Sequence, residues 1–330
     1  RWAGTAESAT RSVLLPANTD DTAGRTRVVA AFLALYFLWG STYLFIKWTV
    51  ADIPPFLAAG LRHGTAGVLL YAWSRLRGAP RPTLEHWGVA FLIGTMLLAA
   101  GNGTVNWATQ RVPSGLSALI VSSVPIWIVT VEWLRPRGIR PSGRTVAGLA
   151  VGSFGIVGLV WSAGGIGART SNAPAVLLAC LGLVLGSMSW ATGSVLSRHL
   201  PRQPHGQLAT SMEMIAAAVV LVPVSWLTGD IGRFHPSTVS ATSWWSLAYL
   251  ITSGSLIGFS AYNWLLRVSM PSKVATYAYV NPIVAVALGW TFAGERLTTA
   301  TFGAAALLLA AVVLLTIPSR TALREVFGAR

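Results

Sequence analysis

Three ionisable side chains lie inside long apolar stretches of this sequence, where a charge is costly. Arg62 and Glu213 each stand about eight residues inside an apolar run, and His63 follows Arg62 directly. A charge at the centre of a membrane helix costs on the order of 2.5–3.5 kcal/mol by insertion scales, so each group needs a partner or a function. Arg62 and Glu213 could form a buried ion pair or bind a solute. His63 titrates near neutral pH, which makes it a candidate proton carrier or, as a lone histidine, a packing residue.

A second group of residues could bind a small-molecule substrate, because polar and aromatic side chains recur four residues apart within apolar runs. Such pairs lie on one face of a helix, and buried amides need partners in the protein or in a wet cavity. Some of them could instead only join helices. The substrate-binding candidates are Trp39, Tyr43, Asn102, Asn106, Trp190, Tyr262, Asn263, Tyr277 and Asn281.

Long apolar runs supply the elements that must position these side chains. Hydrophobic residues make up 53% of the 330 residues and charged residues only 10%, too few to cover a soluble surface. Runs of about 20 apolar residues suit membrane-crossing helices. The expected spans are 28–49, 55–74, 86–107, 113–134, 143–161, 174–197, 206–227, 243–266, 273–292 and 298–318. The sequence therefore predicts an all-α integral membrane protein with ten transmembrane helices in a lipid bilayer.

Basic residues between the spans indicate the orientation. Of the 24 Lys and Arg residues, 18 fall on one side of the expected membrane and 4 on the other. Positive charge gathers in cytoplasmic loops, so we expect both termini in the cytoplasm, with 1–27 a disordered tail and 319–330 a second tail. Lys47 lies near the outer end of its span, where it can reach the headgroups. The net charge of +14 does not form a stripe with interleaved aromatic residues, which argues against nucleic acid.

The sequence also contains an internal repeat. Asn106 precedes Pro125 by 19 residues, and the same separation joins Asn263 to Pro282. Two halves of five spans each, 28–161 and 174–318, must insert with opposite orientations because five is odd. We therefore expect two inverted five-helix repeats with a substrate site near the midplane. The two prolines either bend helices that gate the path or are tolerated kinks.

Several short motifs occur in one order along nearly the whole chain. They are Trp39-Gly40-Ser41-Thr42-Tyr43, Pro54-Pro55-Phe56 with Gly60-Leu61-Arg62, Gly101-Asn102-Gly103, Val112-Pro113-Ser114-Gly115, Ser189-Trp190-Ala191, Tyr279-Val280-Asn281-Pro282 and Gly294-Glu295-Arg296-Leu297. In this order they resemble the EamA-type, ten-helix branch of the drug/metabolite transporter superfamily. The motif at 294–297 has no clear counterpart in the first half, where Arg135-Pro136-Arg137-Gly138 occupies the loop. The resemblance implies export of amino acids or similar metabolites across a bacterial cytoplasmic membrane, driven by an ion or metabolite gradient.

The function expected from these features is secondary transport of small amphipathic metabolites, with alternating access at a cavity between the repeats and protons as a candidate coupling ion. Export of drugs, cationic dyes or nucleosides is the alternative. A membrane-embedded enzyme is a weaker one, because the sequence has neither His-Glu-x-x-His nor Gly-x-Ser-x-Gly. A channel or scaffold is a third. We expect no cofactor and no metal site, and the single Cys180 excludes an internal disulfide. The sequence leaves the substrate, the coupling and the oligomeric state open.

Overall fold

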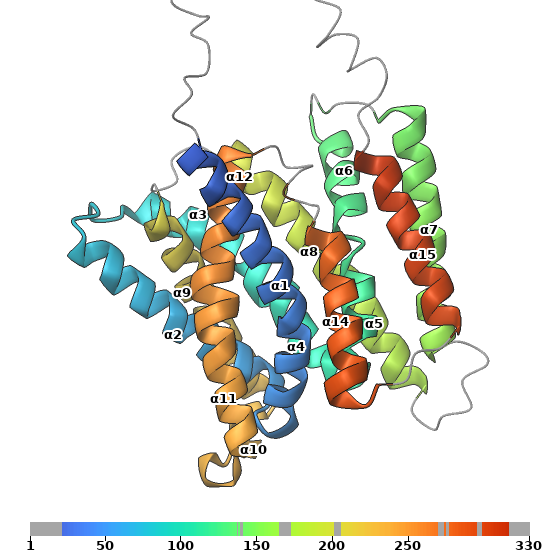
Figure 1. Cartoon of the computed structure of the whole chain (residues 1–330). Helices are drawn as coiled ribbons and strands as arrows, with labels where there is room; N and C mark the ends of the chain where they lie inside the picture. The colour runs from blue at the N-terminus through green and yellow to red at the C-terminus, as the bar shows by residue number, and fades with distance from the viewer. Residues whose placement is uncertain are drawn as a thin grey trace, which may run out of the picture.

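The computed structural model describes residues 22–136, 138, 141–164, 173–200, 206–269, 274, 277–295 and 299–316. Within these ranges the secondary structure is helical and contains no strand, so the prediction of an all-α fold is confirmed. Helices occupy all ten predicted spans and form one bundle (Figure 1). The tail predicted at 319–330 lies outside the described residues.

The first five spans are built from eight helical segments. Three of these spans are continuous or nearly so, whereas the third and the fourth are divided into shorter pieces. The segments are α1 (Thr22–Asp52), α2 (Pro55–Leu76), α3 (Leu84–Gly94), η1 (Thr95–Asn102), α4 (Gly103–Thr109), α5 (Ser114–Val121), α6 (Val124–Leu134) and α7 (Gly143–Gly164). Helix α1 begins at Thr22, so the described end of the predicted 1–27 tail is helical rather than disordered.

The last five spans repeat this order, with one span again divided into three pieces. The segments are α8 (Ala173–His199), α9 (Gln207–Leu227), α11 (Ala241–Tyr249), η3 (Leu250–Phe259), α12 (Ser260–Val268), α14 (Tyr277–Ala293) and α15 (Thr299–Thr316). Two short helices, α10 (Asp230–Arg233) and η2 (Pro236–Thr238), form a connection in which the sequence predicted only a loop. We refer below to the α12 end of the bundle, where α1 begins, and to the opposite α10 end (Figure 1).

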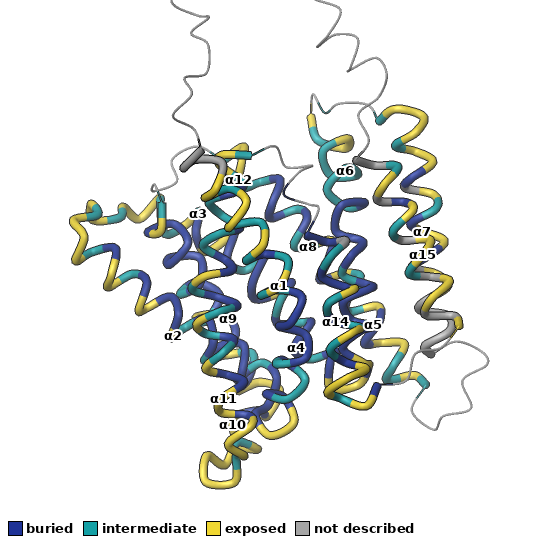
Figure 2. Tube along the Cα trace, in the orientation of Figure 1, coloured by how far each residue is buried: buried dark blue, intermediate teal, exposed yellow. Residues whose placement is uncertain are grey.

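Length and composition suit a membrane. Helix α2 has 22 residues, which at about 1.5 Å each spans a hydrocarbon core of about 30 Å. In the described part of the chain, five segments are long and apolar enough to cross a membrane: Thr26–Asp52, Leu84–Thr109, Ser114–Leu134, Ala173–His199 and Gln207–Leu227. Large apolar side chains such as Leu185 (64% exposed) and Phe154 (72% exposed) are open to the surroundings. Figure 2 shows exposed positions along the outer helices of the bundle. Such a surface is stable only against lipid.

Helices α2 and α9 pack closely because glycines on α2 leave room for the partner. A β-carbon on Gly60 would lie 3.3 Å from Val222, and one on Gly67 would lie 2.9 Å from Ile215. The partner numbers fall as the α2 numbers rise, so the two helices run antiparallel. They are the second spans of the two predicted halves, and antiparallel packing is what inversion requires. Inversion of the halves as whole units stays a prediction.

Two π-helical segments stand at equivalent places in the two halves. Segment η1 ends at Asn102, four residues before Asn106, and η3 ends at Phe259, four residues before Asn263. The sequence repeat pairs these two asparagines. A π-helix has a wider turn than an α-helix and is frequent at functional sites. The repeat therefore extends to a local backbone feature that composition did not predict.

The symmetric prolines behave differently. The fourth span divides between α5 and α6, and Pro125 stands in the first turn of α6, where a missing N–H costs nothing. Pro282 lies inside the continuous helix α14. Pro125 therefore stands at a break between two helices, whereas Pro282 is tolerated inside a continuous helix.

Candidate functional site

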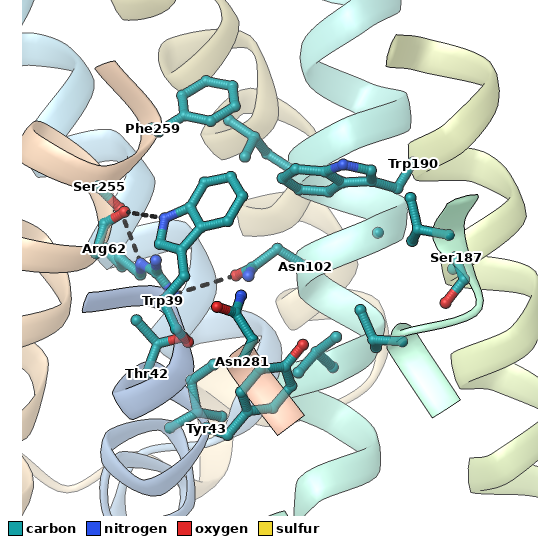
Figure 3. Close-up of a pocket in the computed structure, with 18 of the residues that line it drawn as sticks. Trp39, Thr42, Tyr43, Arg62, Asn102, Ser187, Trp190, Ser255, Phe259 and Asn281 are labelled. Carbon is teal, nitrogen blue, oxygen red and sulfur yellow. Dashed lines mark hydrogen bonds between the residues drawn. The ribbon is translucent and has the colours of Figure 1, made fainter. Parts of the chain in front are cut away.

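A cavity lies in the middle of the bundle, between helices of both halves. About 70 Å³ of it is available to the centres of water molecules, and one water needs roughly 10–15 Å³ by that measure. It therefore has room for several waters. Figure 3 shows the side chains around it. The lining residues are Trp39, Thr42, Tyr43, Ile46, Arg62, His63, Leu98, Gly101, Asn102, Val105, Val121, Val124, Gly186, Ser187, Trp190, Gly254, Ser255, Phe259, Tyr277 and Asn281.

Aromatic rings close the side of the cavity nearest the α12 end. The Trp39 ring lies 5.6 Å from Trp190, 5.1 Å from Tyr262 and 5.2 Å from Tyr277, measured between centroids. The Trp39 indole N–H donates to the carbonyl of Gly254 at 3.0 Å. Edge-to-face and tilted contacts at these distances add attraction to simple burial. We call Trp39, Trp190, Tyr262 and Tyr277 the aromatic layer.

Arg62 forms a polar part of the cavity wall beside Trp39, since both side chains approach Gly254 (Figure 3). Its side chain comes from α2 and is 4% exposed. Nε donates to the hydroxyl of Ser255 at 2.8 Å, and Nη1 points to Oδ1 of Asn102 at 3.4 Å. Gly254 makes the approach possible, because a β-carbon there would lie 2.7 Å from Nη2. The guanidinium is therefore held by η1 and η3, the two π-helical segments.

Asn102 organises the polar groups around Arg62. Its Oδ1 also accepts from Nδ2 of Asn106 at 3.1 Å and lies 3.2 Å from Nε2 of His63. Since that oxygen is an acceptor, Nε2 of His63 must carry the proton. Nδ1 of His63 is buried without a hydrogen-bond partner in the described part of the chain. Three neighbouring donors thus converge on one amide oxygen.

Most sequence-predicted binding residues line this cavity, and some do not. The residues that line it are Trp39, Tyr43, Asn102, Trp190, Tyr277 and Asn281, together with Arg62 and His63. Asn106 lies behind Asn102 and positions it. Tyr262 belongs to the aromatic layer and donates to or accepts from Ser194 at 2.8 Å. Asn263 is elsewhere, beside Glu213.

Glu213 lines a second, larger pocket near the α12 end. It accepts from Nδ2 of Asn263 at 2.9 Å, and that amide also donates to Thr210. The pocket leaves about 520 Å³ to the centres of water molecules, and Arg198 and Arg267 also line it. Because Tyr262 precedes Asn263 and contacts Trp39, the aromatic layer lies between the two pockets.

The suggested ion pair between Arg62 and Glu213 does not form. Their hydrogen-bond partners differ, and they line different pockets. The antiparallel register explains this: Gly60 lies beside Val222 and Gly67 beside Ile215, so the two charges are about seven residues, or roughly 10 Å, apart along the axis. Each charge therefore has its own environment.

The cavity residues that sequence reasoning missed include three with hydroxyl groups, Thr42, Ser187 and Ser255, and the aromatic Phe259. Thr42 stood inside a motif, but its small side chain gave no reason to single it out. Ser187 and Ser255 lie in apolar runs that contain several other serines, so residue type alone did not distinguish them. The available signal for Ser255 was its place in the span that matches the Asn102 span.

Lys47 does not simply reach towards headgroups. Its Nζ lies 2.7 Å from Oε1 of Glu295, and the Glu295 side chain is 5% exposed. The same carboxylate accepts from the N–H groups of Ser114 and Gly115 and from the Ser114 hydroxyl. Burial alone would raise the pKa of Glu295, but these bonds outweigh it and lower the pKa below its ordinary value. The charge at 295 is therefore tied to α1 and to the start of α5.

Comparison with known proteins gives the family. The EamA-like transporter family model matches residues 26–161 and 177–317. The chain belongs to the EamA-like transporter family. The resemblance read from the motifs is thereby confirmed, and the family model matches twice, once over each predicted half. This EamA protein is a membrane transporter. Groups of three or more metal-binding side chains are not found among its described residues.

Relatives of known sequence agree with this assignment, and a solved structure shares the fold. The uncharacterized inner membrane transporter YedA of Escherichia coli (strain K12) is 39% identical over 288 residues, which cover 87% of this EamA chain and 90% of YedA. Protein PecM of Dickeya dadantii is 26% identical over 266 residues, 80% of this chain and 83% of PecM. A solved crystal structure superposes with a TM-score of 0.63 at 20% identity, over 90% of this chain and 99% of that one. The similarity to this crystal structure concerns the fold alone.

Proposed function

We propose that this protein is a secondary transporter that exports small amphipathic metabolites, by alternating access at the central cavity. The cavity is the observation that carries the proposal. Its walls come from α1, α2, η1, α4, α5 and α6 of the first half and from α8, η3 and α14 of the second. A site between two halves is what rocking of one half against the other needs.

The aromatic layer supplies a barrier on one side. Trp39 and Trp190 line the cavity, while Asn263, next to Tyr262, lines the second pocket. The layer therefore closes the cavity towards the α12 end. Passage of a solute requires these rings to separate, and closure of the other end would then expose the cavity to one side at a time.

The proposed orientation places the α12 end and both termini in the cytoplasm of a bacterial cell, at its cytoplasmic membrane. Described basic residues at that end support it, because positive charge favours the cytoplasmic side. They are Arg75, Arg77, Arg81, Arg135, Arg198 and Arg267. The second pocket would then be the cytoplasmic entrance, and transport towards the α10 end would be export.

Transport by purified protein in liposomes tests the proposal. We expect saturable uptake of one class from a panel of labelled amino acids, monocarboxylates, nucleosides and cationic dyes, measured with and without a pH gradient. Replacement of Trp39 by Ala should reduce uptake at least about tenfold, because the layer and the cavity share this ring. The matched control is Trp245→Ala, since Trp245 is 76% exposed on the surface. Absence of saturable uptake by folded protein of defined orientation would refute the proposal.

A further inference from the structure

The charge of Arg62 has no counter-ion in the described part of the chain. Five described carboxylates contact other groups. Asp52 accepts from the hydroxyls of Ser240 and Ser243, and Glu213 accepts from Asn263. Glu132 pairs with Arg135 and His199, Asp230 pairs with Arg233, and Glu295 pairs with Lys47. None of the described carboxylates lies within ion-pair distance of Arg62. A guanidinium stays charged in proteins. The cavity therefore contains a fixed positive charge that the described chain does not neutralise.

The contacts that Arg62 makes are too few to satisfy it. A guanidinium has five N–H donors in a planar fork, and the hydrogen bonds to Ser255 and Asn102 use two of them. Both acceptors are neutral oxygens. A buried charge without an ionic partner is costly, so its retention in a membrane helix indicates a role. The unused donors of the fork match the two oxygens of a carboxylate.

The rest of the cavity wall is suited to an apolar body. Trp39, Trp190, Phe259 and Tyr277 present rings to the same space, and Figure 3 shows Trp39, Trp190 and Phe259 on the side away from Tyr43. Aliphatic side chains such as Leu98 and Val124 complete the wall. The charge of Arg62 and the apolar rings therefore face the same space, and this combination suits an amphipathic anion.

We propose that the solute carries a carboxylate that pairs with Arg62 and an aromatic or aliphatic body that packs against the rings. This inference rests on the proposed transport function and narrows its substrate to monocarboxylates. The described residues that line the cavity include no carboxylate. A cationic dye would meet Arg62 in a medium of low dielectric without compensation. An amino acid belongs to the class through its carboxylate.

Binding of three small probes of matched shape tests the charge requirement. The probes are phenylacetate, which is anionic at pH 7.5, its neutral amide phenylacetamide, and the cation phenethylamine. We would measure quenching of tryptophan fluorescence and the shift in melting temperature of the purified full chain. We expect phenylacetate to bind at least about tenfold more tightly than either of the others, because only it can pair with Arg62. Equal binding of all three, preference for the cation, or no binding of phenylacetate would overturn the inference.

Variants at position 62 test whether the preference for phenylacetate depends on Arg62. Arg62→Gln should abolish the difference between phenylacetate and phenylacetamide, and Arg62→Lys should keep part of it, because the charge remains without the fork. Arg111→Gln is the control, since Arg111 is an exposed arginine at the α10 end that donates to the Trp107 carbonyl. Undiminished preference in R62Q, or the same loss in R111Q, would overturn the inference. If R62Q does not fold, R62K and the wild-type probe series still decide.

Transport separates the two proposals. Saturable uptake of a neutral or cationic solute that Arg62→Gln leaves unchanged would overturn the carboxylate inference and leave the transport function standing. Anion binding that depends on Arg62, without saturable uptake of any solute, would refute the transport function and leave an anion site. Uptake of phenylacetate that falls at least about tenfold in R62Q, with R111Q at the wild-type rate, would support both.

Discussion

Two charged side chains of this protein are almost equally buried but have very different surroundings. Arg62 lies in the central cavity and is 4% exposed, and Glu295 follows α14 near the α10 end and is 9% exposed. A glycine stands against each: a β-carbon on Gly254 would lie 2.7 Å from Nη2 of Arg62, and one on Gly289 would lie 2.5 Å from Oε2 of Glu295. In both places the backbone makes room for a charge.

The difference lies in the partners. Glu295 has a counter-ion, Lys47, and accepts three further hydrogen bonds from Ser114 and Gly115. Among the described residues, Arg62 has two acceptors, and both are neutral. A fully satisfied charge fixes the positions of helices, whereas an incompletely satisfied one can bind something else. Burial is therefore common to both charges, and the lack of a counter-ion among the described residues is what separates Arg62 from Glu295.

Removal of the satisfied charge should have the largest effect on stability. Glu295→Ala leaves Lys47 and three donors at the start of α5 without their acceptor. We expect a loss of about 3–5 kcal/mol, the range for breaking a buried pair by removing one partner. Denaturant or thermal unfolding of purified protein in detergent measures it. Arg62→Gln should cost less stability than Glu295→Ala, because it removes an uncompensated charge.

The control for this experiment is an ion pair at the surface. Glu132 pairs with Arg135 and His199, and its side chain is 30% exposed. Glu132→Ala should therefore change stability by about 0–1 kcal/mol. If E295A and E132A were equally mild, or if R62Q were the most destabilised, the contrast between a structural and a functional charge would be lost.

Sequence reasoning predicted the fold well because the fold of a membrane protein follows from the order of apolar and polar segments along the chain. Runs of apolar residues determine where spans begin and end, and helix α8 (Ala173–His199) matches its predicted span 174–197 within two residues. Boundaries failed where helix continues into polar sequence, as at Thr22. The π-helical segments and the break before Pro125 depend on local hydrogen bonding, which apolar periodicity does not report.

The site was less predictable because it depends on register between helices. Depth along a single span suggested that Arg62 and Glu213 could meet, but the antiparallel register of α2 and α9 separates them. Lys47 contacts Glu295, which lies 248 residues away in the sequence, and no local sequence pattern predicts this contact. Helical spacing did find Trp39 with Tyr43 and Tyr277 with Asn281, since pairs on one helix face need no knowledge of the neighbours.

The two glycines offer a sharper form of the comparison. Gly289→Ala drives a methyl group against a carboxylate that is fixed by four bonds, and it also approaches Ser114 Oγ at 3.0 Å. We expect a loss of about 1–3 kcal/mol, typical of overpacking. Gly254→Ala presses instead on the end of the Arg62 side chain, which is held by two contacts and can shift into the cavity.

We therefore expect Gly254→Ala to cost under about 1 kcal/mol of stability while it weakens binding of phenylacetate. Gly289→Ala should show the reverse: lower stability, with unchanged preference for the anion in protein that remains folded. Melting temperatures and probe titrations of the same two samples measure both effects. Equal losses of stability, or a binding defect confined to G289A, would contradict the assigned roles.

The last prediction concerns the pH dependence that Glu295 gives to stability. Its folded pKa is lowered, because the bonds from Lys47 and from Ser114 and Gly115 outweigh the effect of burial. Folding therefore gains stability from this carboxylate above its unfolded pKa, about 4.3, and loses that gain as pH falls through the lower folded value. Glu295→Gln does not titrate at this position, so its stability should lie about 1–2 kcal/mol below wild type at pH 7, and the gap should close in acid. Melting temperatures of both proteins between about pH 3 and pH 7 measure this convergence. Parallel curves across that range would show that the carboxylate does not stabilise the fold through its charge.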